Sequence, residues 1–265
     1  MNQASLQSLR STLGLGEIKY FNSIGSTNDE ALAWANKGAP DFSVVIADEQ
    51  TMGRGRMDRP WFTPAGTALA FSLILRPTAA ERLFLSRFVG LAALSICEPL
   101  QNLGLKPQIK WPNDILLNHR KIAGVLIELV WAGEDVQCVV IGIGLNVLKR
   151  AVPDTDLLRF PGTSLETALE REVAREEVLH DILTAFASLR SELGSDDLMN
   201  QWGMALAFRG KQVRVEMGAG KTVTGRLEGI LSDGSLRVRD DNNNSVTVQF
   251  GDVSLRPFTG ILNYR

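Results

Sequence analysis

Apolar and polar positions follow two different periods along this chain, and the change of period marks the expected elements. Short, strongly apolar runs, typical of strands, lie at residues 17–21, 43–49, 67–75, 109–111, 122–131 and 136–147. Helical spacing occurs at residues 2–13, 27–37, 83–103 and about 166–208. Gly142 and Gly144 interrupt the last apolar run, and glycine inside a strand marks a bulge or a close approach by a ligand.

The helix expected after residue 26 has signals at both ends. Ser26 or Thr27 can cap it, acidic residues follow in its first turn, and Gly38 comes after its end. A simple N-cap is the default interpretation of Ser26. A helix N-terminus also presents free amide groups to a polar ligand, so capping and binding do not exclude each other.

The composition of the chain changes at Gly210. Short alternating runs separated by tight polar turns follow at residues 212–216, 222–230, 235–239 and 245–250. This pattern is typical of a small SH3-like β-barrel. We therefore expect two domains, residues 1–209 and residues 210–265.

Composition and charge disfavour several classes of protein. The 265 residues are 45% apolar and 22% charged, as in soluble globular proteins, and a formal net charge of −2 disfavours bulk attraction to DNA. Cys97 and Cys138 lie far apart in apolar stretches, so we expect reduced thiols, and with only two histidines the chain has no structural zinc site. No apolar run is as long as a membrane span and no signal peptide is recognisable, so we expect a cytoplasmic protein.

A loop rich in glycine and arginine, GRGRMDRPW at residues 53–61, separates two of the expected strands. Glycine lets the backbone approach a ligand closely, and arginine offers a planar fork of donors that matches carboxylate and phosphate oxygens. The loop therefore suits an anionic ligand. Taken alone, it fits a solvated basic turn or an RG-type nucleic-acid contact equally well.

A second cluster of charges, KWPND at residues 110–114, is followed closely by Lys121 and Gly124. Pro112 biases Trp111 towards extended geometry, so Lys110 should stand at the end of a strand. Lysines on both sides of a tight turn can neutralise negative charge on a phosphoryl group or a carboxylate. A hairpin corner with solvated charges is the alternative, and the apolar surroundings of Trp111 disfavour it.

Together these segments closely resemble the motifs of biotin protein ligases. The matching segments follow in the family's order at residues 26–28 (STN), 53–61 (GRGRMDRPW), 110–114 (KWPND), 121–124 (KIAG) and 141–146 (IGIGLN). The resemblance covers about residues 17–258. It implies an α+β fold with a mixed β-sheet flanked by helices, like that of class II synthetases and biotin–lipoate ligases, followed by the SH3-like barrel.

The resemblance also implies a reaction. The carboxylate of biotin would attack the α-phosphate of Mg-ATP to give biotinyl-5′-AMP, and a lysine of a biotin carboxyl carrier protein would then take the biotinyl group. ATP, Mg²⁺ and biotin would be substrates, and the carrier would belong to acetyl-CoA carboxylase or a related biotin-dependent carboxylase, with a homodimer as a further possibility. Because no nucleophile–histidine pair is recognisable, catalysis would rest on positioning and charge neutralisation.

Roles for individual residues follow from the same resemblance. Biotin would be bound by Ser26, Thr27, Asn28, Gln50, Arg54, Gly55, Arg56, Lys121 and Gly124. The nucleotide would be bound by Arg59, Trp61, Lys110, Asn113 and Asn146. The catalytic groups would be Arg56, Lys110, Lys121 and Asp114, without a protein-bound metal. Asp114 would assist magnesium or the incoming lysine amine, and a turn-stabilising role fits it as well.

Two departures from the family pattern stand out. Many relatives have glycine where this chain has Asp58, whose charge would pair with Arg56 or Arg59 and hold the empty loop, or lie in solvent. The segment before Ser26 is too short for the helix-turn-helix domain that some relatives carry, so we expect a ligase that does not act on DNA.

Two other classes of function compete with this interpretation. A lipoate or octanoate ligase or transferase shares the fold but would lack this arginine-glycine loop. A non-catalytic nucleic-acid adaptor would use the loop and the barrel as binding surfaces, and the net negative charge and the lysine segment count against it.

Overall fold

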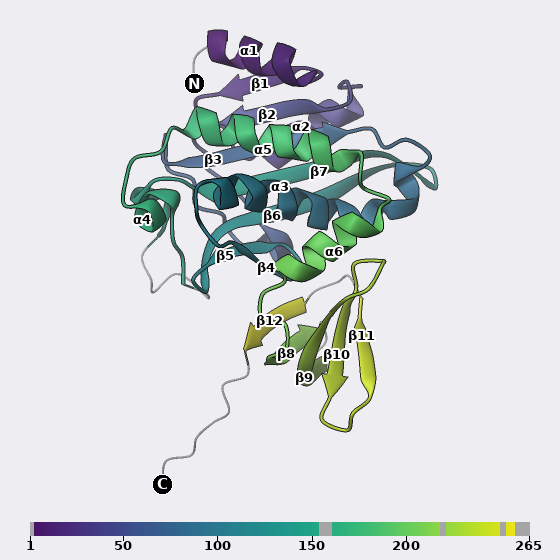
Figure 1. Cartoon of the computed structure of the whole chain (residues 1–265). Coiled ribbons are helices and arrows are strands. Elements are labelled where there is room, and N and C mark those ends of the chain that lie inside the picture. Colours follow the sequence, from purple (N-terminus) through teal and green to yellow (C-terminus); the bar gives the residue numbers. More distant parts are fainter. Residues whose placement is uncertain (1–2, 154–160, 218–220, 250–252, 258–265) are drawn as a thin grey trace.

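Two β-sheets form the framework of the computed structural model, which describes residues 3–153, 161–217, 221–249 and 253–257 (Figure 1). The first sheet consists of β1 (Ile18–Phe21), β2 (Ser43–Ala47), β3 (Ala68–Leu75), β4 (Gln108–Lys110), β5 (Asp114–Leu117), β6 (Arg120–Ala132) and β7 (Asp135–Asn146). Its strands are ordered β1-β2-β3-β7-β6-β5-β4; β1 and β2 are parallel and the other neighbours are antiparallel. The mixed sheet expected from the sequence is confirmed.

Helices cover both faces of this sheet. On one face, α2 (Thr27–Asn36) packs on β2, β3, β6 and β7 and forms a small apolar core. On the other face lies the larger core, with α3 (Phe88–Asn102) and α5 (Arg175–Arg190) in front of the sheet in Figure 1. The remaining helical segments are α1 (Gln3–Leu13), α4 (Leu165–Leu169), α6 (Asp196–Ala205), η1 (Arg56–Asp58), η2 (Glu81–Arg87) and η3 (Lys149–Ala151).

The alternation of side chains along β7 explains why one face of the sheet carries both a core and a cavity. Cys138 and Val140 belong to the small core under α2, whereas their neighbours Val139 and Ile141 belong to the large core. The series on the α2 face continues at Gly142, which faces the polar start of α2 rather than its apolar body. This face is therefore apolar under α2 and polar beyond its N-terminus.

Gly142 and Gly144 do not mark a bulge, since the pairing of β7 with β3 and with β6 is regular across both residues. A Cβ atom at Gly142 would lie 2.2 Å from Asn28 Oδ1, and one at Gly144 would lie 2.3 Å from the ring of Trp61. The close approaches that require these glycines come from side chains of the chain itself.

The helix expected at residues 83–103 is broken. The 3₁₀ segment η2 precedes α3, and Phe84 has a non-helical φ of −126°. Together η2 and α3, Glu81–Asn102, have the length and composition of a membrane span, although charged residues interrupt the apolar run there. However, 72% of its most apolar window is buried in the protein, as in the core helix of a globular fold.

The second sheet consists of β8 (Gln212–Met217), β9 (Lys221–Ile230), β10 (Leu236–Asp240), β11 (Ser245–Val248) and β12 (Val253–Pro257). It is antiparallel, in the order β11-β10-β9-β8-β12. The sequence pattern predicted the first four strands and missed β12, a short edge strand that ends in proline. The predicted strand at 245–250 ends at Val248, and Phe250 lies outside the described residues.

The turn between β9 and β10 holds two side chains from outside the second sheet, Arg87 at the end of η2 and Trp111 between β4 and β5. The indole Nε1 of Trp111 donates to the carbonyl oxygen of Gly234 at 2.9 Å. The guanidinium of Arg87 donates to the carbonyl of Ser232 at 2.9 Å and to two carbonyls of the connection between α5 and α6. Both side chains are buried, so these bonds hold the β9–β10 turn against η2 and against the turn between β4 and β5.

Candidate active site

A cavity opens on the α2 face of the sheet, beyond the start of α2. Its lining comes from five segments, at residues 26–28, 50–61, 110–114, 121–126 and 142–144. It includes every site residue expected from the sequence except Asn146, which lines an adjoining cavity. The two cavities share Gln50, Pro60, Trp61 and Lys121, so they lie next to each other.

The start of α2 forms the polar end of the cavity. Ser26 is the N-cap and its hydroxyl accepts from the amide of Asp29 at 3.4 Å, as the default interpretation predicted, while the same residue also lines the cavity. Gln50 Oε1 accepts from the amide of Thr27 at 2.8 Å and from its hydroxyl at 3.0 Å. The side-chain nitrogen Nε2 of Gln50 donates to Thr63 Oγ1 at 3.3 Å, so both ends of the Gln50 amide have partners and its orientation is fixed.

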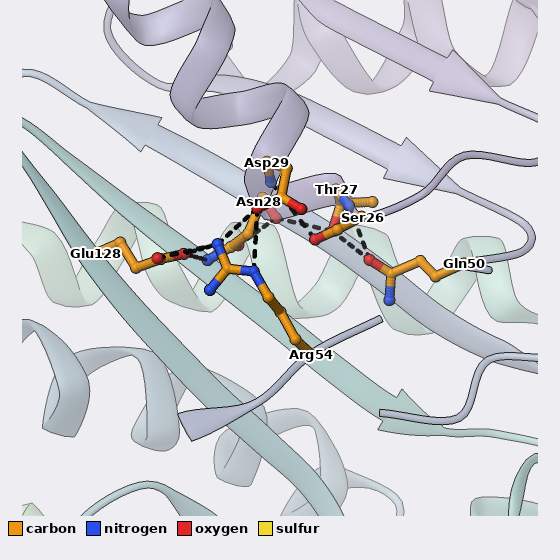
Figure 2. Close-up of polar contacts among 8 residues, drawn as sticks. Ser26, Thr27, Asn28, Asp29, Gln50, Arg54 and Glu128 are labelled. Carbon is orange, nitrogen blue, oxygen red and sulfur yellow. Dashed lines mark hydrogen bonds and ion pairs between the residues drawn. The ribbon is translucent and has the colours of Figure 1, made fainter. Parts of the chain in front are cut away.

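A continuous chain of hydrogen bonds runs from this point across the sheet (Figure 2). The hydroxyl of Ser72 lies 2.9 Å from Thr27 Oγ1 and 2.6 Å from Asn28 Oδ1, so its single proton can serve either acceptor. The amide of Asn28 then donates to Glu128 Oε2 at 2.8 Å. These donors and acceptors are pre-ordered for a neutral polar ligand.

Arg54 ends the chain of bonds. Figure 2 shows its guanidinium between two carboxylates, with Nη2 at 2.6 Å from Asp29 Oδ1 and at 2.9 Å from Glu128 Oε2. Hydrogen bonds to Asp29, and next to Glu128, raise the pKa of Arg54 above its ordinary value. Arg54 therefore lines the cavity with its charge already paired.

The turn at residues 110–114, called the lysine turn below, forms the opposite wall of the cavity. The Asp114 carboxylate lies 3.3 Å from Lys110 Nζ and 2.6 Å from Lys121 Nζ. Burial alone would raise the pKa of Asp114, but the positive charges of Lys121 and Lys110 outweigh burial and lower that pKa below its ordinary value. At neutral pH, Asp114 is a carboxylate that holds both ammonium groups at the cavity.

A turn-stabilising role was one of the alternatives for Asp114, but the side chain that makes such a bond is that of the neighbouring Asn113. Its Nδ2 donates to the carbonyl of Val125 at 2.7 Å, and its own carbonyl accepts from the amide of Val125 at 2.9 Å. Asn146 is used similarly, since its Nδ2 donates to the carbonyl of Thr163 at 3.0 Å. Both asparagines expected at the nucleotide therefore use an amide proton within the chain.

Trp61 lies where the two cavities meet. Its ring fills the space left by Gly144, and the ammonium of Lys121 is 5.2 Å from the ring centroid, within cation–π range. The indole Nε1 of Trp61 is buried and has no hydrogen-bond partner among the residues that the structure describes. The ring thus offers an aromatic wall to both parts of the site.

The tip of the arginine loop, unlike these walls, is exposed at Met57 and Asp58. Met57 and Asp58 have φ angles of 59° and 53°, and Met57 is 58% exposed. Among the described residues, Asp58 has no side-chain hydrogen bond or ion pair, so the expected pairing with Arg56 or Arg59 is not formed and Asp58 lies in solvent. Arg56 and Arg59 both line the cavity, and Arg59 Nη2 also donates to the sulfur of Met57 at 3.4 Å.

The sequence analysis missed three residues of the polar network: Ser72, Asp29 and Glu128. Two of them carried a signal, because Ser72 and Glu128 are isolated polar residues inside strands that are otherwise largely apolar. Burying a carboxylate costs free energy unless the carboxylate is paired, so a glutamate at such a position predicts a partner elsewhere in the chain.

Comparison with known proteins gives the family. Residues 20–146 match the Biotin/lipoate A/B protein ligase family, and residues 208–256 match the Biotin protein ligase C terminal domain. The biotin--[acetyl-CoA-carboxylase] ligase of Paracoccus denitrificans is 36% identical to this chain, over 81% of this chain and 90% of its own length. The chain belongs to the biotin protein ligase family.

Longer relatives of this biotin protein ligase family member share only part of their length with it. The bifunctional ligase/repressors BirA of Bacillus spizizenii and Bacillus subtilis are 38% identical over 63% of this chain, which spans about half (51%) of their length. The structure of the biotin protein ligase from Aquifex aeolicus in complex with biotin and ATP has a TM-score of 0.79 at 24% identity, covering 91% of this chain and 99% of that one. This likeness shows a shared fold.

Proposed function

We propose that this biotin protein ligase family member uses ATP to form biotinyl-5′-AMP with release of pyrophosphate, and then transfers the biotinyl group to a lysine of a biotin carboxyl carrier protein with release of AMP. The observation that carries the proposal is the division of the cavity. Its end at α2 offers fixed, mostly uncharged hydrogen-bonding groups, whereas its end at the lysine turn offers ammonium groups. Biotin has the same division, with a neutral ureido head and an anionic carboxylate.

The ureido head would lie at the start of α2. Ser26, Thr27, Asn28 and Gln50 line the cavity there, and most of their side-chain amides and hydroxyls are already ordered. Such preorganisation lowers the entropy lost on binding. Gly55, Arg56 and Gly124 line the same cavity and would complete the biotin site.

In the first step, Lys121 would hold the biotin carboxylate and Lys110 would balance charge at the α-phosphate. Both ammonium groups lie at the cavity wall within reach of a single carboxylate, that of Asp114. They can be preoriented for charge that develops at phosphorus, which is the most effective form of electrostatic catalysis. Arg59, Asn113 and Asn146 would line the nucleotide, with Trp61 as an aromatic wall for its base.

In the second step, an amine from the carrier would attack the acyl carbonyl and AMP would leave. Asp114 is the carboxylate nearest to both lysines and is ionised at neutral pH, so it can accept a hydrogen bond from the incoming ammonium or amine. Among the described residues there is no cluster of three His, Cys, Asp or Glu side chains suited to a metal ion. We therefore propose that Mg²⁺ binds through the phosphates of ATP, and we assign Asp114 to the amine.

The proposed domains are residues 1–209 and 210–265, with the second named SH3-like. This division is supported by the start of the second sheet at Gln212. The carrier protein is the proposed partner because the Paracoccus relative is named for acetyl-CoA carboxylase. A lipoate or octanoate substrate and a nucleic-acid adaptor are the competing functions, and the ion-paired state of Arg54 weighs against an RG-type nucleic-acid contact.

Exchange of labelled pyrophosphate into ATP tests the function directly. Exchange should require biotin and magnesium together, because labelled pyrophosphate enters ATP only by reacting with biotinyl-AMP in the reverse of the first step. Equal exchange with lipoate or octanoate would overturn the substrate, and no exchange with any of the three acids would overturn the activity. Single-turnover transfer to purified carrier protein tests the second step separately.

A further inference from the structure

Glu128 joins two parts of the site that are far apart in the sequence. Its carboxylate accepts from Asn28 at the start of α2 and from Arg54 at the root of the arginine loop. We propose that Glu128 is a positioning residue that fixes the amide of Asn28 and tethers the arginine loop through Arg54. The inference deepens the proposed function and rests on it for the part that concerns biotin.

The position of Glu128 on β6 shows why its charge matters. Val130, two residues further along the same strand, belongs to the small core under α2, so Glu128 faces the same side of the sheet. Its side chain is only 26% exposed. A carboxylate in such surroundings is stable when it is paired, and Arg54 supplies the charge while Asn28 supplies a further donor.

At the pocket, Glu128 decides which way the amide of Asn28 points. The oxygen of this amide accepts from Ser72 at 2.6 Å, and its nitrogen donates to Glu128 at 2.8 Å. With both ends fixed, the second amide proton of Asn28 has one direction available. Without the carboxylate the nitrogen loses its acceptor, and the flipped amide becomes accessible.

At the loop, Glu128 holds the root of a small hairpin. Backbone bonds from Trp61 to Gly53 and from Gly55 to Arg59, each 2.7 Å, close the neck of the loop around an antiparallel bridge between Arg54 and Pro60. The side chain of Arg54 ties this neck to Glu128 and to Asp29 on α2. Arg54 is thus the root of the loop, and Met57 and Asp58 form its exposed tip.

The first test is the isosteric substitution Glu128→Gln, with Glu134→Gln as the matched control. Glu134 is exposed at the turn between β6 and β7, so the control removes the same charge without touching the network. We expect Glu128→Gln to weaken biotin binding by about ten-fold, because one charge-assisted partner of Arg54 is lost while Asp29 remains. Glu134→Gln should bind biotin like the unaltered protein.

The second test isolates the pair. Arg54→Gln and Glu128→Gln should not be additive, so the double variant should bind biotin no more weakly than the weaker single variant. The surface partner gives a graded check, since Asp29→Asn should have a smaller effect than Glu128→Gln; the Asp29 side chain is 53% exposed. Additive effects of Arg54→Gln and Glu128→Gln would overturn the tether.

A third readout does not depend on biotin. Limited trypsin digestion of the ligand-free protein can cut after Arg54 or after Arg56, and mass spectrometry distinguishes the two products. We expect cleavage mainly after Arg56, and a rise of several-fold in cleavage after Arg54 in Glu128→Gln but not in Glu134→Gln. An unchanged ratio in a variant that melts like the unaltered protein would overturn the tether; if Glu128→Gln does not fold, the shorter carboxylate in Glu128→Asp tests the same pair by the same ratio.

The readouts also separate this inference from the proposed function. A changed cleavage ratio in a protein that shows no biotin-dependent pyrophosphate exchange would support the tether and reject the ligase function. Normal exchange with an unchanged ratio and unchanged biotin affinity in Glu128→Gln would support the function and reject the tether.

Discussion

The lysine turn and the arginine loop bring positive charge to the same cavity but are held in opposite ways. The turn at residues 111–113 is anchored on both sides, by Trp111 to Gly234 of the second sheet and by Asn113 to Val125 of β6. The tip of the loop at residues 56–58 is a single 3₁₀ turn without a buried residue. One region is rigid because two sheets hold it, and the other is tethered only at its root.

This difference fits the two demands that the proposed reaction makes. Charge neutralisation at phosphorus requires ammonium groups that do not move during the reaction, which the turn provides. Biotinyl-AMP is a reactive mixed anhydride, so the site must also close over it and later open to the carrier. A loop with a fixed root and an exposed tip can do the second task and would perform the first poorly.

The largest effect should come from the rigid region. Lys121→Gln keeps much of the side-chain length and removes the charge that would balance the biotin carboxylate. We expect the single-turnover rate of adenylate formation to fall by about 100-fold or more, within the range for loss of one preorganised electrostatic group. The melting temperature should change little, since Lys110 still pairs with Asp114.

Lys221→Gln, an exposed lysine at the start of β9, is the matched control for this substitution. It removes the same charge from the second sheet and should leave the rate unchanged. If Lys121→Gln also formed the adenylate at the normal rate, Lys121 would be a structural partner of Asp114 only.

The next effect should come from the arginine loop. Arg56→Gly removes a cation that lines the cavity, and one charge-assisted bond typically contributes about 1.5–3 kcal/mol, or roughly ten- to a hundred-fold in retention. We expect this variant to form biotinyl-AMP and to release it early. A streptavidin blot of serum albumin incubated with enzyme, biotin and Mg-ATP should then show albumin labelled by the variant. Equal labelling by the unaltered enzyme would mean that Arg56 does not retain the intermediate.

The same contrast shows what the sequence could and could not predict. The motifs at residues 26–28, 53–61 and 110–114 predicted the lining of the cavity, because each is a local pattern with its own chemistry. The periods of 2 and 3.6 predicted most strands and helices. The break at Phe84 was not predicted, since both sides of it are apolar and the pattern continues across the kink.

Pairings between distant residues lay beyond the sequence. Glu128 and Arg54 are 74 residues apart, and no local pattern indicates which cation a lone carboxylate meets. The sequence indicated a close approach at Gly142 and Gly144. It did not indicate that Asn28 and Trp61 fill these spaces, because that depends on how α2 and the arginine loop fold back onto β7. The solvent exposure of Asp58 was one of two alternatives, and the positive φ angle of this residue supports it geometrically.

A smaller effect is expected at the junction of the two sheets. Trp111→Phe removes the Nε1 donor to Gly234, whereas Trp202→Phe removes a buried Nε1 without a hydrogen-bond partner in the described part of the chain. Both changes remove the same volume from buried sites. The difference in unfolding free energy, measured with urea, should therefore be about 1 kcal/mol, with Trp111→Phe the less stable. Trp111→Phe should also slow adenylate formation a few-fold, and equal effects of the two variants would mean that the bond does not hold the turn.

The smallest effect should come from Asp58, at the tip of the loop. Its φ angle is 53° and its side chain has no partner among the described residues, so its charge and its backbone conformation can be tested separately. Asp58→Asn removes the charge and keeps a side chain that tolerates this conformation, whereas Asp58→Gly also removes the Cβ that is strained there. We expect retention of biotinyl-AMP to change by less than about two-fold in Asp58→Asn, since an exposed, unpaired charge contributes little.

Asp58→Gly should stabilise the protein slightly, by under about 1 kcal/mol, because the glycine relieves strain but is more flexible when unfolded. A ten-fold change in retention for Asp58→Asn would show that Asp58 holds the closed loop, and the loop tip would then be fixed by charge as the lysine turn is.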